Sequence, residues 1–141
     1  MSPDNPWFKK IDHLGIAIPS LETALPVYET LFGQTVEHIE EVPDQGVRTA
    51  FFSVGESHFE LLEPMDDTGP IARYLEKRRG GIHHVCVEVT DIDAVLAEYK
   101  RNGVRLIDEE PRKGAKGMRV AFVHPAATGG VLLELSQPGT D

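Results

Sequence analysis

The chain contains two related halves, and this duplication limits its fold more than any other feature of the sequence. The segments around His13 and His84 are alike, and the two histidines lie 71 positions apart. Four further pairs match at this offset: Ile11 and Ile82, Leu14 and Val85, Leu25 and Leu96, and Tyr28 and Tyr99. A repeat of this length is typical of a duplicated supersecondary module rather than of a solenoid built from short repeats.

The first half predicts the element order β-α-β-β-β. Apolar residues alternate from Leu14 to Ile18, which is the pattern of a half-buried strand. Ser20 is a suitable N-cap for an amphipathic helix that ends at Gly33. Strand patterns bounded by turn residues follow at positions 35–41, 47–54 and 58–63. A short linking helix is predicted over 71–79, before the glycine pair at 80–81.

The second half repeats this order. We expect a strand over 82–89, a helix over 91–102, strands over 104–107, 118–123 and 131–135, and a flexible glycine-containing loop over 113–117. The sequence therefore predicts an α+β fold within a single domain, 1–141. It consists of a first βαβββ module (9–64), a linker helix region (65–80) and a second βαβββ module (81–137).

Composition excludes several classes of function. The chain has 14 basic and 23 acidic residues and a formal charge of −9, the wrong sign for a nucleic-acid-binding protein. Its apolar runs are too short for a membrane span or a signal peptide. Cys86 is the only cysteine, so an internal disulfide is excluded and a cytoplasmic location is expected.

An anionic small molecule remains compatible with this acidic chain if basic residues gather locally. Four basic residues lie close together in the sequence and are the candidates for such a substrate-binding patch: Arg112, Lys113, Lys116 and Arg119. A solvated charged loop is the alternative interpretation of the same four residues.

Each half ends in a strand that carries a carboxylate. Glu60 and Glu134 occupy the same place when the halves are aligned on the prolines that follow, and apolar residues flank each of them. Both therefore project to the face opposite the helix side. Burying such a carboxylate is costly unless a positive group lies opposite, and a divalent metal is one such group.

A histidine and a glutamate from each half form a mixed nitrogen and oxygen ligand set. His13, His84, Glu60 and Glu134 suit Co²⁺, Mn²⁺, Ni²⁺, Zn²⁺ or Fe²⁺ rather than a metal that prefers thiolates. One strand histidine alone is more often a structural residue than a ligand. The recurrence of the same His-then-Glu order after the duplication favours the metal site.

Several segments together resemble the vicinal oxygen chelate superfamily, which includes glyoxalases, bleomycin resistance proteins and dioxygenases, and within it most closely the methylmalonyl-CoA epimerase family. These segments are 11–17, 32–33, 60–64, 81–85, 122–125 and 130–135. The resemblance covers about residues 9–137. It implies paired βαβββ modules that form a curved, barrel-like mixed sheet around a metal cleft, with His13, Glu60, His84 and Glu134 as the ligands.

The resemblance also implies an activity. The implied activity is that of a metal-dependent isomerase, which interconverts the 2R and 2S forms of methylmalonyl-CoA. Such an enzyme removes the proton at C2 and forms an enolate that the metal stabilises. Glu60 and Glu134 are the expected proton-transfer residues, and Co²⁺ is the favoured ion. The resemblance further implies an acyl-CoA substrate and a homodimer.

The chain departs from the family pattern at two positions. Several members carry glutamine where this chain has Glu60, and some carry a glutamate, proposed as a catalytic base, near Thr49. Two other activities therefore stay open: a glyoxalase I-type lactoylglutathione lyase with a similar ligand set, and a module of the same fold that binds a small molecule or a cationic antibiotic.

Overall fold

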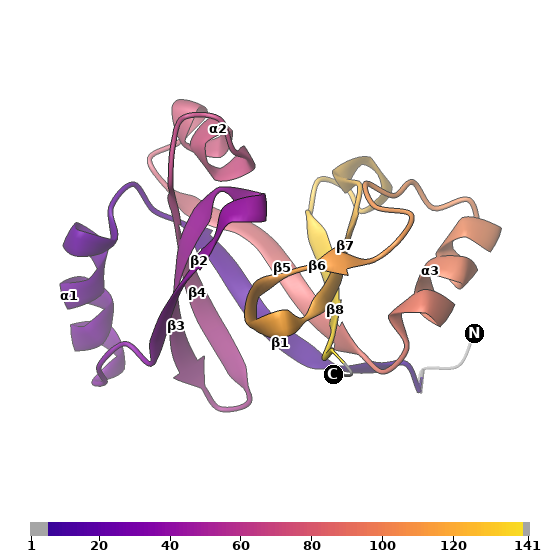
Figure 1. The fold of residues 1–141 in the computed structure, drawn as a ribbon, viewed down its shortest axis with the longest axis horizontal. Coiled ribbons are helices and arrows are strands. Elements are labelled where there is room, and N and C mark those ends of the chain that lie inside the picture. Colours follow the sequence, from indigo (N-terminus) through magenta and orange to yellow (C-terminus); the bar gives the residue numbers. More distant parts are fainter. Residues whose placement is uncertain (1–5, 140–141) are drawn as a thin grey trace. The chain divides into compact units, whose positions relative to one another are not determined.

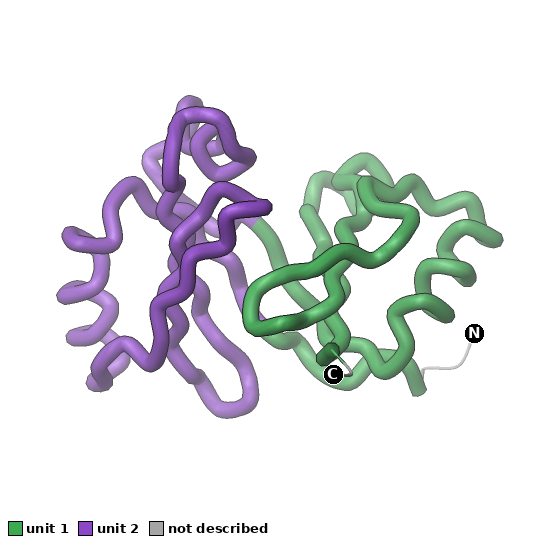
Figure 2. Tube along the Cα trace, in the orientation of Figure 1, with its two compact units in different colours: residues 1–12, 84–141 green, residues 13–83 purple. Residues whose placement is uncertain are grey.

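The computed structural model describes residues 6–139, and these form two compact units (Figure 2). Unit 2 is His13–His83, and unit 1 consists of the described parts of 1–12 and 84–141. The first strand, β1 (Phe8–Ala17), is therefore divided between the units. Within the described residues, no helix is both long enough and apolar enough to cross a membrane.

Unit 2 contains the second part of β1, three further strands and two helices (Figure 1). The strand order is β2-β3-β4-β1, in which β1 runs parallel to β4 and the other neighbours are antiparallel. The elements after β1 are α1 (Leu21–Phe32), β2 (His38–Val42), β3 (Val47–Val54), β4 (Ser57–Pro64) and α2 (Pro70–Lys77).

Unit 1 repeats this arrangement. The strand order is β5-β8-β7-β6, with β5 parallel to β8 and the remaining neighbours antiparallel. The elements are β5 (Gly81–Val89), α3 (Ile92–Arg101), β6 (Arg112–Lys113), β7 (Arg119–Val123) and β8 (Leu133–Gln137), and the first three residues of β5 fall in unit 2.

One helix packs against one face of the strands in each unit and forms its core. The period-2 alternation of the strands places apolar side chains on the helix face and leaves the opposite face for polar ones. The core of unit 2 consists of Ile16, Ile18, Leu21, Ala50, Phe52 and Leu61. The core of unit 1 consists of Val89, Ile92, Val95, Leu96, Ala121 and Leu135.

The N-terminus of the main helix is held in the same way in both units. Ser20 accepts a hydrogen bond from the amide of Thr23, and the Asp91 carboxylate accepts one from Ala94. The last strand then supplies a second acceptor. Glu63 Oε2 accepts from the Leu21 amide, and Gln137 Oε1 accepts from the Ile92 amide, both at 2.8 Å. These acceptors satisfy amides that the first helical turn leaves without partners.

The predicted α+β class and the paired βαβββ order are confirmed. One predicted strand is wrong, because residues 104–107 form only an isolated bridge between Leu106 and Val123. The amides of Ile107 and Asp108 both donate to the Phe122 carbonyl, whereas the Phe122 amide donates to the Asp108 carboxylate instead of a backbone carbonyl, so no regular ladder forms there. The last strand of the sheet is instead β6, whose second residue, Lys113, is the first residue of the loop expected over 113–117. In unit 2, β2 begins at His38 rather than at residue 35.

The Glu63 carboxylate predicts a measurable contribution to stability. Replacing Glu63 by alanine removes the acceptor for the Leu21 amide, and we expect the free energy of unfolding to fall by about 1–2 kcal/mol in chemical denaturation. Glu63→Gln keeps an acceptor oxygen, as Gln137 does in the other unit, and retains most of this stability. Equal losses for both substitutions would show that the Glu63 charge, which also faces Arg48, rather than the hydrogen bond accounts for the stability.

Candidate metal and proton-transfer site

In unit 2 a histidine and a glutamate meet through the parallel pairing of β1 with β4. Gly15 lies opposite Glu60 in this pairing, so His13, two residues earlier, projects to the same face of the sheet. The Nδ1 atom of His13 lies 3.0 Å from Oε2 of Glu60. Both side chains are buried, which makes this pair part of the interior rather than a surface ion pair.

In unit 1 an equivalent pair occurs at the same register. Cys86 lies opposite Glu134 in the parallel pairing of β5 with β8, and His84 precedes Cys86 by two residues. The Nε2 atom of His84 lies 3.1 Å from Oε1 of Glu134, and both side chains are again buried. The duplication seen in the sequence is therefore repeated in the strand register and in the side-chain contact.

The chemistry of these pairs fits a divalent cation. Ligand bonds of about 2.1 Å that meet at a right angle place two ligand atoms about 3.0 Å apart, which matches the nitrogen–oxygen distance in each pair. A hydrogen bond gives a similar distance. A buried carboxylate that faces an imidazole gains further stabilisation from a cation, because its negative charge is costly to bury.

Each pair is accompanied by a phenylalanine that sequence reasoning missed. Phe51 lies opposite Glu60, and Phe122 lies opposite Glu134 in the antiparallel ladders. The ring of Phe122 meets that of His84 edge-on, with centroids 5.8 Å apart. The two phenylalanines are related by the same 71-residue offset as the histidines, and this was the signal for them in the sequence. They provide an apolar wall that reduces the access of water to the carboxylates.

Two of the four predicted substrate-binding residues pair with aspartates. Arg112 Nε lies 3.5 Å from Asp108 Oδ1, and Arg119 Nη2 lies 3.0 Å from Asp93 Oδ2. The guanidinium of Arg112 also lies over the ring of Phe122, 5.5 Å from its centroid, on the face that carries Glu134. Arg112 is thus connected to a site residue through Phe122.

The two lysines of this group occupy the hairpin that leads into β7. Lys113 pairs with Arg119 across the β6–β7 ladder, so two cationic side chains share one face there. Lys116 has a φ of 58°, in the left-handed region that favours glycine. The four residues therefore do not all act as free cations on one patch.

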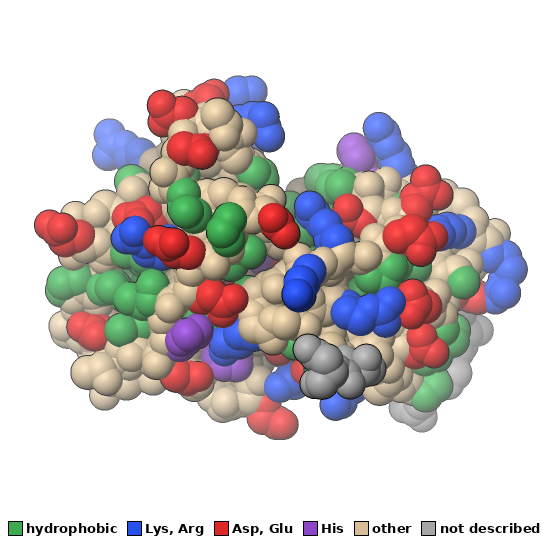
Figure 3. Space-filling model, viewed as in Figure 1, with side chains coloured by type: hydrophobic (Ala, Val, Ile, Leu, Met, Phe, Trp, Pro, Cys, Tyr) green, Lys and Arg blue, Asp and Glu red, His purple; other side chains and the backbone are tan. Residues whose placement is uncertain are grey.

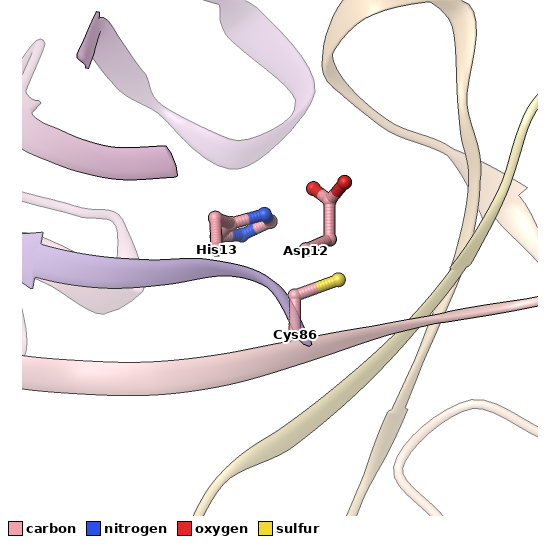
Figure 4. A group of neighbouring side chains, drawn as sticks. All are labelled: Asp12, His13 and Cys86. Carbon is pink, nitrogen blue, oxygen red and sulfur yellow. The ribbon is translucent and has the colours of Figure 1, made fainter. Parts of the chain in front are cut away.

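Cys86 lies beside the acidic group of Asp12. Figure 4 shows these two side chains, with His13 as the next residue of β1. The Cys86 sulfur and an Asp12 oxygen lie within 4.8 Å of one another. Cys86 is fully buried, and a carboxylate beside a thiol disfavours its thiolate form, so this cysteine is unsuited to act as a nucleophile.

Comparisons with known proteins identify close relatives. Residues 12–122 match the family model described as the glyoxalase/bleomycin resistance protein/dioxygenase superfamily. The chain is 40% identical over 129 residues to the mitochondrial methylmalonyl-CoA epimerase of Homo sapiens, covering 91% of this chain and 73% of that protein.

Solved structures agree with this result. The crystal structure of methylmalonyl-CoA epimerase from Mycobacterium tuberculosis has a TM-score of 0.92 and 35% identity, covering 99% of this chain and 94% of that one. A methylmalonyl-CoA epimerase in complex with methylmalonyl-CoA and NH4+ has a TM-score of 0.89 and 35% identity, covering 94% of this chain and 96% of that one.

The burial of Cys86 predicts its reactivity. In the native protein we expect no reaction of this thiol with a disulfide reagent such as 5,5′-dithiobis(2-nitrobenzoate), and one reactive thiol per chain after unfolding in guanidinium. The matched control is Asp67→Cys, which places a second thiol at an exposed loop position and should react at once. Rapid reaction of native wild-type protein would contradict the burial.

Proposed function

Because this chain belongs to the glyoxalase/bleomycin resistance protein/dioxygenase superfamily and is closely related to the methylmalonyl-CoA epimerases, we propose that it interconverts the 2R and 2S forms of methylmalonyl-CoA. The observation that supports the proposal most directly is the repeated His–Glu pair, at the same strand register in each unit. Inversion at one carbon needs a proton-transfer group on each face of that carbon, and a duplicated carboxylate supplies two.

The proposed reaction moves one proton away from C2 of the acyl group and returns one to the opposite face. One glutamate takes the proton, the electron pair of the C–H bond forms a double bond between C2 and the carbonyl carbon, and the carbonyl π pair moves onto the thioester oxygen. The other glutamate then donates a proton from the far side, and the electron pair returns to C2. We assign these two roles to Glu60 and Glu134, whose burial keeps water from competing for the proton.

We further propose that His13, Glu60, His84 and Glu134 bind one divalent cation. The mixed nitrogen and oxygen donors favour Co²⁺, with Mn²⁺, Ni²⁺, Zn²⁺ and Fe²⁺ as alternatives. When bound, this cation supplies positive charge that stabilises the developing oxyanion of the thioester. Each unit contributes one histidine and one glutamate, so neither unit alone holds the full ligand set.

Arg112 is the best placed of the predicted substrate-binding residues for the carboxylate of the acyl group. Its guanidinium lies over Phe122, which in turn contacts His84. An arginine can bind a carboxylate through two parallel hydrogen bonds. Lys113, Lys116 and Arg119 remain proposed contributors to acyl-CoA binding, and the homodimer and the cytoplasmic location remain predictions from the sequence.

Exchange of the C2 proton tests the reaction. With Co²⁺ in D₂O, we expect the protein to interconvert the epimers and to incorporate deuterium at C2. Mass spectrometry measures the deuterium, and chiral analysis of the acyl group measures the interconversion. Glu60→Gln and Glu134→Gln each remove one proton carrier but keep an oxygen ligand. Each variant should lose interconversion by about 10²-fold or more, while one epimer still exchanges its own proton.

Other results would identify a different activity. Absence of exchange by the metal-loaded wild-type protein would contradict the epimerase proposal. Turnover of the glutathione hemithioacetal of methylglyoxal by the same preparation would support a lactoylglutathione lyase instead. Retention of full interconversion by both variants would remove the glutamates from proton transfer.

Metal binding is tested separately from activity. We expect one Co²⁺ per chain by elemental analysis after dialysis, and a higher melting temperature when the ion is added. His13→Ala and His84→Ala, one from each unit, should each lose most of this stabilisation. His38→Ala is the control, since His38 is half-exposed and lies outside the proposed ligand set. A stoichiometry of two ions per chain, each lost with a different histidine, would contradict a shared site.

A further inference from the structure

The α2 region carries a basic surface in a protein of negative net charge. Four of the seven residues 73–79 are basic, against one acid, while the whole chain has a formal charge of −9. We define the α2 basic surface as the exposed residues Arg73, Lys77, Arg78 and Arg79. Figure 3 shows basic side chains over the region that holds α2, beside acidic ones.

Most of these cations have no acidic partner. Within residues 6–139, Arg73, Lys77 and Arg79 make no ion pair, whereas Arg112 and Arg119 pair with aspartates. The nearest acids in sequence do not cancel this charge. Glu76 is the one acid within α2, and Asp66 accepts hydrogen bonds from the Thr68 amide and hydroxyl in the preceding loop.

An ordered aromatic side chain lies beneath one of these cations. The Tyr74 hydroxyl donates to the carbonyl of Ile82 at 3.2 Å, and its ring meets that of His83 edge-on. The Arg78 guanidinium lies over the Tyr74 ring, 4.5 Å from its centroid. A Cβ at Gly81 would lie 3.0 Å from the Tyr74 hydroxyl, so the glycine makes room for this contact. Arg78 is therefore held in place before any ligand arrives.

We propose that the α2 basic surface binds the phosphates of the coenzyme A nucleotide. This end of coenzyme A carries a diphosphate and a 3′-phosphate on adenosine, and guanidinium groups bind phosphate through paired hydrogen bonds. The inference rests on the proposed acyl-CoA substrate. It assigns the nucleotide to unit 2, whereas the sequence placed the basic substrate-binding patch at residues 112–119, in unit 1.

The connection of this surface to the site residues supports the assignment. Tyr74 contacts His83, which directly precedes the proposed ligand His84 in β5. The flexible pantetheine arm of coenzyme A separates the thioester from the phosphates, so the nucleotide must bind away from the reacting carbon. A basic surface at the start of the strand that carries a ligand meets this requirement.

Charge reversal tests the assignment. In Lys77→Glu/Arg79→Glu we expect the KM for methylmalonyl-CoA to rise about tenfold or more, because two attractive charge contacts become repulsive. The kcat should stay unchanged, and so should the KM for methylmalonyl-pantetheine, which lacks the nucleotide. Raising the salt concentration should weaken wild-type binding of methylmalonyl-CoA more than that of the variant.

Two matched variants sharpen the result. Arg101→Glu/Arg105→Glu changes the net charge equally on exposed residues elsewhere and should leave both KM values unchanged. Lys113→Glu/Lys116→Glu tests the patch predicted from the sequence, which the proposed function keeps as a contributor to acyl-CoA binding. A rise in KM for methylmalonyl-CoA in this variant but not in Lys77→Glu/Arg79→Glu, or an equal rise in all three variants, would overturn the assignment of the nucleotide to the α2 basic surface.

A binding measurement separates this proposal from the proposed reaction. Calorimetric titration with adenosine 3′,5′-bisphosphate, which contains the nucleoside and two of the phosphates, should show binding by wild-type protein and at least tenfold weaker binding by Lys77→Glu/Arg79→Glu. If the protein exchanges no C2 proton but this difference persists, the epimerase proposal fails and the nucleotide site stands. If exchange proceeds and the two proteins bind the nucleotide equally, the nucleotide site is wrong.

Discussion

Parallel pairing between the first and last strands of each βαβββ module is the constraint on which the candidate site depends. It brings a histidine from near the start of the module beside a glutamate from near its end, at a register that is the same in both modules. Parallel neighbours cannot be joined by a tight hairpin, so a longer connection must lie between them, and in each module this connection is a helix and two strands. The fold therefore places chemically complementary residues together although the chain separates them.

The division of the strands in each module into two faces follows from the alternation of their side chains. The helix face holds the apolar cores, and the other face holds the buried acids Glu60 and Glu134 with their histidines. Hydrophobic burial on one face supplies the stability that lets the other face keep buried charges. The cores carry matched residues in the two modules, whereas Thr49 in β3 has Val120 as its counterpart in β7. The frame is thus symmetric, while this pair of positions in β3 and β7 differs.

Sequence reasoning recovered the features that have a local signal. The strand around His13 was predicted from its alternating apolar residues, and the helix starts were predicted from the caps Ser20 and Asp91. The duplication aligned Glu60 with Glu134. Features that depend on distant partners were not visible. The pairing of Arg119 with Asp93 and the place of the Asp108 carboxylate in the β7 ladder arise only when the chain folds. The ends of strands were uncertain for the same reason, because ladder partners determine where a strand stops.

The hydrogen bond from each helix start to the last strand of its module has a consequence for folding. Glu63 and Gln137 accept from amides that lie far back along the chain, so the first turn of α1 or α3 is completed only when β4 or β8 is in position. Each module then gains this contact late, after a large loop has closed. We infer that a nascent module keeps a frayed helix until its last strand has been synthesised and docked, so that a chain ending before β8 leaves α3 incompletely capped.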